Sequence, residues 1–255
     1  MPDRMRYALH KFDFRLSSAH AVITKALGQV PHWALSCSFG KDSIVLLDIL
    51  IEMGHDDMPI LYSDRGPEAE LPETETVIEQ MQERHSFQLV RVVPRLTMFQ
   101  LYRALGGIPG ITAPGNSSLI RRNNLEEPID GWIKEHNIMG SFLGRRIEEN
   151  PRTRGKHLSV RGPLHFNVGR DLWVCDPLYN WTGADIWAYI VQNDLPYHPL
   201  YDLMARENEG RERARLSNWS GIVGIKYGRW AWLKQHYPDL FNRFAAEFPE
   251  VRCYV

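Results

Sequence analysis

Six consecutive residues near the start of the chain combine the groups with which proteins bind anionic ligands. They follow a short apolar run and precede a longer one, and they are Ser38, Phe39, Gly40, Lys41, Asp42 and Ser43. Gly40 lets the backbone approach a ligand closely, the serine hydroxyls can donate hydrogen bonds, and Lys41 adds a positive charge. Asp42 either caps the following helix or orients Lys41. These residue types predict a cradle for phosphate groups, although they do not form the Gly-x-x-x-x-Gly-Lys-Ser/Thr pattern.

Other charged residues follow later apolar runs in the same way. Asp64 and Gly66 come directly after the apolar run at residues 59–63, and Arg146 follows the apolar run at residues 138–143. Asp64 suits a ribose hydroxyl, a metal–phosphate group or simply a turn before glycine. Arginine binds phosphate or sulfate through paired N–H groups. If a Mg²⁺ ion bridges the phosphates, Asp42 and Asp64 are its candidate ligands.

The elements that position these residues alternate along the first 200 residues. Expected strands are residues 33–37, 59–63, 87–93, 138–143 and 172–175, and expected helices are residues 12–30, 44–51, 72–84, 97–105, 128–136 and 182–192. Thr182 is the expected N-cap of the last helix, with Asp185 at its third position, and Trp181 and Trp187 are expected to pack in the core. This alternation predicts an α/β fold, with a parallel five-stranded sheet and helices on both of its faces. In such sheets ligands bind outside the carboxyl ends of the strands, which is where the candidate residues stand.

After about residue 202 the alternating apolar runs end, and charged residues become dense. We expect residues 1–202 to form the α/β domain and residues 203–255 to form a helical C-terminal extension or lid, which is not an independent domain. A dense charge run lies at residues 206–215. Its arginines, together with Trp219, Tyr227, Trp230 and Trp232, are candidates for a nucleic-acid or partner surface. Because acidic residues interleave with the arginines, the run favours a solvated helix face instead. Two short helices are expected at residues 229–235 and 239–248.

Composition narrows the class of protein. A formal net charge of -1, with 44% hydrophobic and 24% charged residues, is typical of an ordinary globular protein. It carries no global basic bias, so the net charge does not indicate nucleic acid as a partner, while a local basic patch for nucleic acid stays open. No long apolar run and no secretory segment are recognisable, which predicts a cytoplasmic protein without a membrane span. Three separated cysteines and scattered histidines predict no structural metal site.

Five ordered segments carry a resemblance to a known family. They are Ser-Phe-Gly-Lys-Asp-Ser at residues 38–43, Tyr-Ser-Asp-Arg-Gly at 62–66 with Leu-Pro-Glu-Thr at 71–74, Gly-Arg-Arg-Ile-Glu-Glu-Asn at 144–150, Asp-Pro-Leu-Tyr-Asn-Trp-Thr at 176–182 and Leu-Pro-Tyr-His-Pro-Leu-Tyr at 195–201. The chain thereby resembles the phosphoadenosine phosphosulfate (PAPS) reductase family of the adenine nucleotide alpha-hydrolase-like, or PP-loop, superfamily. The resemblance implies a Rossmann-like fold, and residues 38–43 are its PP-loop.

The resemblance also implies a nucleotide site and its ligands. Besides the PP-loop, the implied binding residues are Asp64, Gly66, Gly144, Arg146, Glu149, Arg152 and Arg154. The spacing of the last two arginines differs by one residue from the family pattern. The implied ligand is an adenine nucleotide, namely PAPS, adenylyl sulfate or ATP.

The C-terminal end departs from the family pattern. Reductases of the family carry Glu-Cys-Gly-x-His there, and its cysteine attacks the sulfonate sulfur. Cys253 stands in the corresponding place, but the Gly and His are missing. A thiol mechanism makes Cys253 and Lys41 the catalytic residues and a thioredoxin or similar dithiol the reductant, whereas the alternative is a stray tail cysteine. Serines replace the paired cysteines of cluster-bearing relatives at residues 213–220, so we expect no iron–sulfur cluster.

Three functions remain open after this comparison. The first is a reductase that converts the sulfonate of PAPS or adenylyl sulfate to sulfite. The second is an ATP-cleaving enzyme that forms AMP and pyrophosphate during adenylation or sulfur transfer to a nucleic acid. The third is a nucleotide-binding regulator without catalysis. The shared fold does not separate them, and the oligomeric state, including a homodimer, also stays open.

Overall fold

The structure is a computed structural model that describes residues 4–115, 117–206, 211, 212, 214 and 229–255. The chain divides into two compact units. Unit 1 comprises Met1–Tyr62, Glu73–Arg91 and Asp130–Ala214, and unit 2 comprises Ser63–Pro72, Val92–Ile129 and Arg215–Val255. The boundary that the sequence predicts near residue 202 stays a prediction.

One six-stranded sheet, in the order β3-β2-β1-β4-β6-β5, runs through the fold. Its strands are β1(Trp33–Ser36), β2(Ile60–Ser63), β3(Leu89–Val92), β4(Gly140–Leu143), β5(Leu164–Asn167) and β6(Leu172–Cys175). Strand β1 pairs in parallel with β2 and β4, and β4 pairs in parallel with β6. The register aligns Ser36 at the end of β1 with Leu143 at the end of β4. The loops that follow these two strands therefore start side by side.

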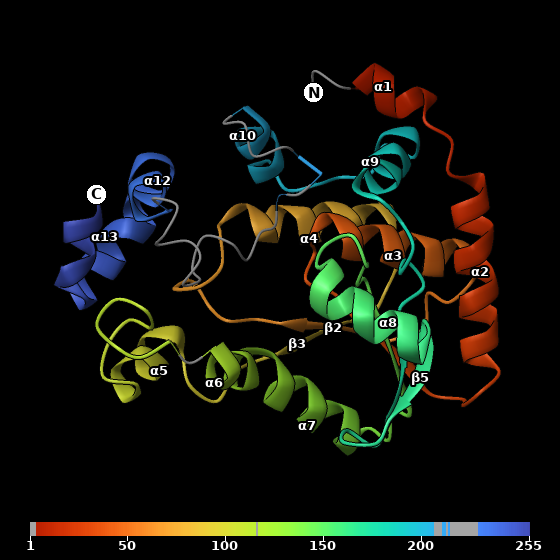
Figure 1. Ribbon diagram of the computed structural model, residues 1–255, viewed down its shortest axis with the longest axis horizontal. Helices are drawn as coiled ribbons and strands as arrows, with labels where there is room; N and C mark the ends of the chain where they lie inside the picture. Colours follow the sequence, from red (N-terminus) through yellow and green to blue (C-terminus); the bar gives the residue numbers. More distant parts are fainter. Residues whose placement is uncertain (1–3, 116, 207–210, 213, 215–228) are drawn as a thin grey trace. The chain divides into compact units, whose positions relative to one another are not determined.

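Helices connect the strands in the expected places. Their bounds are α1(Arg4–Leu9), α2(Asp13–Leu27), α3(Lys41–Glu52), α4(Glu73–Arg84), α5(Met98–Ala104), α6(Ser117–Arg121), α7(Glu127–Glu135), α8(Lys156–Arg161), α9(Gly183–Gln192), α10(Leu200–Arg206), α12(Arg229–His236) and α13(Pro238–Glu247), with the π-helical segments η1(Arg122–Glu126) and η2(Pro151–Gly155) and the 3₁₀ helix η4(Pro249–Tyr254). Figure 1 shows α3 and α4 on one side of strands β2 and β3 and α7 on the other. The prediction of a Rossmann-like α/β fold with helices on both faces is thus confirmed.

Strand β5 was missing from the expected sheet. It pairs antiparallel with β6 and forms an edge of the sheet, so the sheet has six strands and is not wholly parallel. The sequence of β5, Leu-His-Phe-Asn, is short and has no continuous apolar run, and none of its residues is fully buried. An apolar pattern typical of buried parallel strands therefore could not reveal it.

Helix α3 is buried nearly throughout, and a polar network fixes it to its neighbours. Asp48 of α3 is buried and accepts hydrogen bonds from His85 (2.7 Å) and from Tyr189 of α9 (2.8 Å). The Arg84 guanidinium lies 3.6 Å from the same carboxylate. Glu52 completes a group of ligand-type side chains with Asp48 and His85. Because donors and a cation already surround Asp48, this group is a structural network that holds α3 in place.

Helix α9 begins as the sequence predicts. Thr182 and Asp185 form a capping box, in which each side chain accepts from the other residue's backbone N–H. Trp181 and Trp187 are fully buried, which confirms that these aromatic residues belong to the core. Asp185 also accepts from His10 at 2.7 Å. The helix is thereby joined to the N-terminal part of unit 1.

Aromatic packing forms the core of unit 2. Phe99 of α5 packs edge-on against Phe244 of α13 (4.9 Å between centroids) and against Phe248 (5.7 Å). Trp230 of α12 packs against Phe244 at 5.1 Å, and Arg103 pairs with Glu247. Helices α12 and α13 occupy the residues where the sequence predicts two short helices. Trp230 and Trp232 are buried, which removes them from the nucleic-acid surface considered for this segment.

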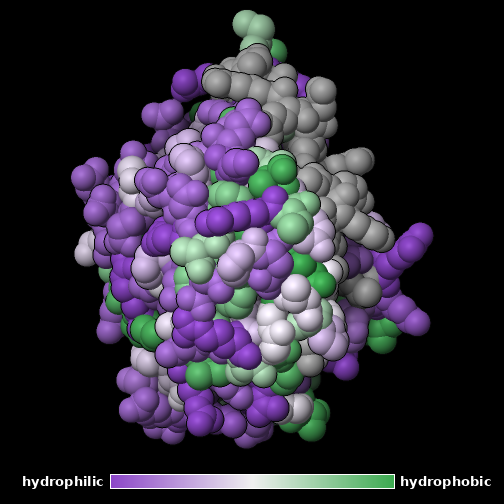
Figure 2. Space-filling model, turned by 90° about the vertical axis from the view of Figure 1, so that its left-hand side faces the viewer, coloured by the Kyte–Doolittle hydropathy of each residue, from purple (hydrophilic) through white to green (hydrophobic). Residues whose placement is uncertain are grey.

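Figure 2 shows one face of the molecule, on which the described residues are coloured by hydropathy. Hydrophilic side chains predominate there, and hydrophobic ones occur in small groups. Single exposed apolar side chains such as Phe14 and Val168 are scattered over different elements. Among the described helices, none combines the length and the apolar character that a membrane span requires.

A buried histidine makes the stability of unit 1 depend on pH. His198 is fully buried, its Nδ1 accepts from the Leu200 N–H at 3.1 Å, and its Nε2 lies 3.8 Å from Glu73 Oε2. Burial lowers the pKa of His198 to about 4. Between this value and the ~6.5 of an unfolded histidine, the unfolded chain binds a proton that the folded protein does not. Acidification through this window therefore favours unfolding.

We expect the free energy of unfolding to fall by about 2 kcal/mol more between pH 7 and pH 5 in the wild type than in His198→Gln, which cannot titrate. Urea unfolding at both pH values measures this difference. His157→Gln, at an exposed position of α8, is the control and should keep the wild-type slope. An unchanged slope in His198→Gln would show that His198 does not cause the pH dependence.

Candidate functional site

The PP-loop lies between β1 and α3, as the sequence predicts. Gly40 is the N-cap of α3 in an extended conformation, with no side-chain cap. Phe39 has a φ of 52°, in the left-handed region that few non-glycine residues adopt. Its fully buried ring packs edge-on against Tyr62 (5.6 Å) and lies 6.5 Å from Phe87. The aromatic contacts thus hold the loop in a conformation that it would otherwise avoid.

The two serines of the loop bind the loop itself. Ser43 Oγ donates to the Gly40 carbonyl at 3.0 Å, and the Ser38 and Ser43 hydroxyls lie 3.3 Å apart. The backbone N–H groups of Ser43 and Ile44 also donate to the Gly40 carbonyl. The start of α3 is therefore closed on itself, and both hydroxyls stand at the helix N-terminus where an anion is favoured.

Lys41 is buried and its ammonium is engaged. Its Nζ donates to Asp42 Oδ2 at 3.1 Å and to the Ala214 carbonyl at 2.8 Å, and it lies 5.3 Å from the centre of the Tyr201 ring. The Lys41 backbone N–H donates to the Tyr201 hydroxyl at 3.1 Å. Tyr201 and Ala214 were not among the predicted site residues. The tyrosine lies in a recognised motif, whereas a carbonyl contact leaves no signal in a sequence.

Asp42 joins the PP-loop to the segment after β4. Its Oδ1 accepts from Arg146 Nε at 2.6 Å, while Oδ2 accepts from Lys41. Burial raises the pKa of Asp42, but Lys41 and Arg146 more than offset this and hold the pKa below its ordinary value. Of the two roles considered for Asp42, the structure supports the orientation of Lys41 and not helix capping.

The Asp42 carboxylate is a poor candidate for a magnesium ligand in this arrangement. Each of its oxygens accepts a hydrogen bond from a cationic side chain. A Mg²⁺ ion bound here would need one of these oxygens for its octahedral shell and would stand next to a lysine or arginine cation. Asp42 therefore does not fit the metal role that the sequence left open for it.

Arg146 is fully buried and lies at the centre of the network. Burial lowers its pKa, but Asp42 and Glu148 outweigh this, so the pKa is raised above its ordinary value. Nη1 donates to Glu148 Oε2 at 2.8 Å and to the Trp181 carbonyl at 3.3 Å, and the backbone N–H donates to Glu149 at 3.3 Å. Glu148 was missed, because the family pattern pointed to its neighbour Glu149 and two adjacent glutamates do not differ in sequence alone.

Gly144 lets the C-terminal end of β4 approach the N-terminal end of α3 closely. A Cβ atom at this position would lie 3.1 Å from the Asp42 carbonyl oxygen and 3.2 Å from the Ser43 nitrogen. Both are backbone atoms, which cannot turn away as the end of a long side chain can. This close approach explains why a glycine stands here, next to the Asp42–Arg146 pair.

We expect Gly144→Ala to lower the free energy of unfolding by about 1–3 kcal/mol, because the methyl group overpacks the backbone of α3. Nucleotide affinity should fall in parallel, since the PP-loop shifts. Urea unfolding and calorimetric titration with adenosine 3′,5′-bisphosphate measure the two effects. Gly131→Ala in α7 is the matched control, because a Cβ there meets nothing within 4 Å. This control should be neutral or up to about 1 kcal/mol more stable, and equal effects at both glycines would refute the packing argument.

The other predicted residues occupy different surroundings. Asp64 and Gly66 belong to unit 2, where Asp64 Oδ1 accepts from the Gly66 N–H at 3.0 Å and Gly66 has a φ of 76°. This is the turn that the sequence allowed for Asp64, and a ligand role there stays a prediction. Arg152 is exposed, at the π-helical segment η2. The backbone of Arg154 lies in the same segment, and its ligand role also stays a prediction.

Arg145 takes a structural role beside Arg146. It forms two hydrogen bonds of 2.6 Å to the fully buried carboxylate of Asp176. In the charge run at residues 206–215, Arg211 is buried and contradicts the expected solvated face at that position. Residues 207–210, 213 and 215 of the run lie outside the described residues. So does most of residues 213–220, where serines replace the family's paired cysteines.

The three cysteines differ sharply in their surroundings. Cys37 and Cys175 are buried, and Cys253 is exposed on η4 in unit 2. Burial raises the pKa of Cys37 to about 11 and also raises the pKa of Cys175. A buried thiol that resists ionisation is a poor nucleophile. Cys253 is therefore the cysteine whose exposure suits thiol chemistry.

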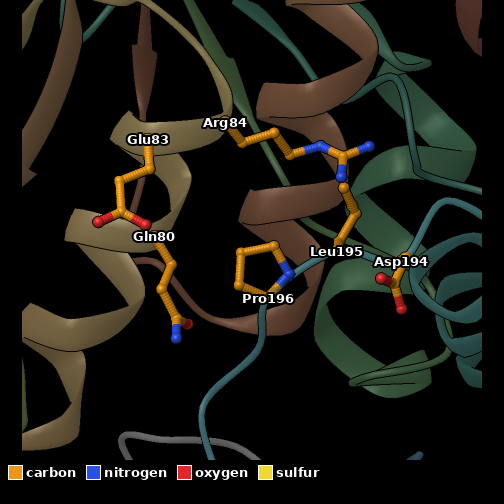
Figure 3. A pocket seen from close by; sticks show the side chains of 6 residues that line it. All are labelled: Gln80, Glu83, Arg84, Asp194, Leu195 and Pro196. Carbon is orange, nitrogen blue, oxygen red and sulfur yellow. The ribbon is translucent and has the colours of Figure 1, made fainter.

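A separate surface pocket of about 500 Å³ lies elsewhere in unit 1. It is lined by Gln80, Glu83, Arg84, Asp194, Leu195 and Pro196. Figure 3 shows Gln80 and Glu83 of α4 on one side of it, the loop after α9 on the other, and the Arg84 side chain reaching from α4 toward Leu195. No lining residue belongs to the PP-loop or to its Arg146 network. The pocket therefore does not extend the predicted nucleotide site.

Comparison with known proteins decides the family. Residues 32–207 match the family described as the phosphoadenosine phosphosulfate reductase domain, which is more than half of the chain. The chain belongs to this family. The match begins just before β1 and includes all six strands, the PP-loop and the Arg146 network. The resemblance inferred from the five segments is thus confirmed for the PAPS reductase domain.

Individual relatives carry names of the same family. The chain is 30% identical over 173 residues to a phosphoadenosine 5'-phosphosulfate reductase from Gloeobacter violaceus, which covers 66% of this chain and 65% of the relative. It is 30% identical over 172 residues to an adenosine 5'-phosphosulfate reductase from Shouchella clausii, covering 66% and 64%. The chain thus spans slightly less than two thirds of these two relatives. A phosphoadenosine 5'-phosphosulfate reductase from Xylella fastidiosa is 30% identical, with coverages of 72% and 74%.

Solved structures share the fold at lower sequence identity. A PAPS reductase from Candida auris, in a phosphate complex, matches with a TM-score of 0.55 and 19% identity, over 73% of this chain and 84% of that chain. An FMN adenylyltransferase from Candida glabrata, in complex with ATP, matches with a TM-score of 0.53 and 16% identity, over 78% and 64%. These likenesses show that the chain shares the α/β fold of both proteins.

Proposed function

We propose that this chain is a sulfonucleotide reductase, which binds PAPS or adenylyl sulfate and releases sulfite. The observation that carries the proposal is the buried Lys41–Asp42–Arg146 network at the carboxyl ends of β1 and β4, within a PAPS reductase domain. Ligands of open α/β sheets bind at this edge. The serines and Lys41 would hold one anionic end of the nucleotide, and the remaining predicted arginines the other.

The chemistry that we propose uses the Cys253 thiolate as the nucleophile. It attacks the sulfonate sulfur, a sulfur–sulfur bond forms, and the bond between sulfur and the phosphate oxygen breaks, so the nucleotide leaves as its 5′-phosphate. A dithiol such as thioredoxin then attacks the Cys253 sulfur and displaces sulfite. The second thiol of the reductant resolves the mixed disulfide, and the reductant is oxidised by two electrons. These reaction steps fit the cytoplasmic location that the amino-acid sequence predicts, because dithiols are kept reduced in that compartment.

Parallel calorimetric titrations test the proposed substrate. The wild-type protein is titrated with PAPS, adenylyl sulfate, adenosine 3′,5′-bisphosphate and ATP, the last with and without Mg²⁺. We expect sulfonucleotides and their product nucleotides to bind more tightly than ATP. A preference for ATP with Mg²⁺, together with formation of AMP and pyrophosphate, would contradict the reductase and support the ATP-cleaving alternative. Tight binding without turnover of any ligand would support the regulator.

A further inference from the structure

Three described residues beyond α10 reach back to the PP-loop lysine. We call Arg211, Glu212 and Ala214 the strap, and all three belong to unit 1. The Ala214 carbonyl accepts from Lys41 Nζ at 2.8 Å. This bond is buried, and it is shorter than the 3.1 Å bond from the same ammonium to Asp42. The strap is therefore in direct contact with the group that the proposed function assigns to the nucleotide.

The strap is anchored on α9 by its first residue. Arg211 is buried, with its guanidinium 5.1 Å from the centre of the Trp187 ring and in an ion pair with Asp202. The Trp187 indole N–H donates to the Arg211 carbonyl at 3.1 Å. The same indole packs edge-on against Tyr201 at 5.4 Å. A single buried tryptophan thus holds both the strap and the tyrosine that binds the Lys41 backbone.

Glu212 fastens the strap from the other side. It accepts from the Tyr7 hydroxyl at 3.0 Å and from Arg6 at 3.1 Å. A Cβ atom on Gly183 would lie 2.6 Å from the Glu212 Cβ and 3.1 Å from its Cα. Glycine at the start of α9 is therefore needed for the strap to pass. These contacts form a built docking site and not a chance approach of one carbonyl.

The burial of the Lys41 ammonium makes the strap and a nucleotide competitors for it. An ammonium has three N–H donors, and here one is directed to Asp42 and one to Ala214. The side chain is 1% exposed. Because this buried ammonium is covered by its acceptors, a nucleotide phosphate that takes it displaces one of them. The neutral Ala214 carbonyl is the weaker one, because a hydrogen bond between two charged groups is stronger than one to a neutral oxygen.

We propose that the strap is a latch on Lys41, and that Arg211 and Glu212 are positioning residues for the nucleotide site. With the site empty, the strap holds the Lys41 ammonium on the Ala214 carbonyl. When the phosphates of an adenine nucleotide take the ammonium, the strap is released. Nucleotide binding and strap docking therefore oppose each other. This inference rests on the proposed function for the identity of the ligand, but not for the contact itself.

The contact is tested without any nucleotide by acylating the folded protein with an amine-reactive reagent and following Lys41 by peptide mass spectrometry. We expect Lys41 to react faster in Arg211→Ala than in the wild type, because release of the strap exposes the ammonium. Glu212→Ala provides a second, milder route to the same release if Arg211→Ala does not fold. Arg170→Ala is the matched control, since it breaks another ion pair of unit 1, with Asp130, that has no link to Lys41. Equal labelling in the wild type and the strap variants overturns the proposal.

The coupling is tested with adenosine 3′,5′-bisphosphate as the probe. We expect the strap variants to bind it about tenfold more tightly than the wild type and Arg170→Ala. Limited trypsin cleavage after Arg211 should accelerate when the probe is added to the wild type. Weaker binding by the variants, or protection from trypsin, would show that the strap covers the nucleotide, and the latch would be refuted. Failure of every nucleotide to bind contradicts the proposed function, whereas the labelling comparison still decides whether the strap holds Lys41.

Discussion

Replacing Cys253 with serine is expected to abolish sulfite release from PAPS or adenylyl sulfate. Of the three cysteines, Cys37 and Cys175 are buried with a raised pKa, so neither can replace an exposed thiolate. Sulfite release in the presence of a dithiol measures the effect. Without the dithiol, intact-mass spectrometry should find a sulfonate adduct on the wild type and none on Cys253→Ser. Nucleotide affinity should stay unchanged, because serine is nearly isosteric with cysteine.

Cys175→Ala is the control for this substitution. Cys175 lies on β6 within the sheet, and its loss affects packing but not the proposed reaction. The variant should keep sulfite release at temperatures at which it is folded. If Cys253→Ser retains full activity, the thiol mechanism at Cys253 is wrong, and the missing Gly and His of the family's tail motif mark a real loss of that chemistry.

Replacing Arg146 with methionine is expected to destabilise the protein by about 3–5 kcal/mol, because the buried Asp42 carboxylate then loses one of its two cationic partners. Arg146 is fully buried and binds Asp42, Glu148 and the Trp181 carbonyl. Nucleotide affinity should fall by at least about 30-fold, or ~2 kcal/mol, since Asp42 no longer orients the lysine. Urea unfolding and calorimetric titration measure the two quantities.

Two further variants test whether the buried network around Arg146 causes this loss of stability. Arg146→Lys keeps the charge but loses the planar fork, so its stability should lie between those of the wild type and Arg146→Met. Arg122→Ala breaks an exposed ion pair with Glu127 and should change stability by less than about 1 kcal/mol. A loss in Arg146→Met no larger than that in Arg122→Ala would show that the buried network contributes little.

Periodicity and motif order predicted most of the fold, because buried parallel strands and capped helices leave strong local signals. The five expected strands, the PP-loop between β1 and α3, and the Thr182 cap all appear in the structure. Strand β5 left no such signal, since its four residues are half-buried or exposed and form no continuous apolar run. The division into two units was equally hidden, because each unit joins segments that are far apart in the chain.

The candidate site was predicted in its charged residues but not in its connections. Lys41, Asp42 and Arg146 were named from residue type and motif, and the structure joins them through Asp42. The partners Glu148, Tyr201 and Ala214 were missed for physical reasons. One of two adjacent glutamates makes the ion pair, a tyrosine hydroxyl binds a backbone N–H, and a carbonyl accepts from an ammonium. Such contacts depend on the fold and not on residue type.

The conformation of Phe39 indicates that the PP-loop takes its shape during folding and not on ligand binding. A left-handed backbone at a non-glycine residue costs about 1–2 kcal/mol, and here the burial of the Phe39 ring against Tyr62 offsets this cost during folding. The loop is therefore preorganised, so an arriving ligand has little backbone entropy to remove. Glycine at this position would relax the backbone and release the ring together, leaving a flexible loop that the ligand itself would have to order. The aromatic side chain thereby fixes the shape of the loop that the proposed function assigns to the nucleotide.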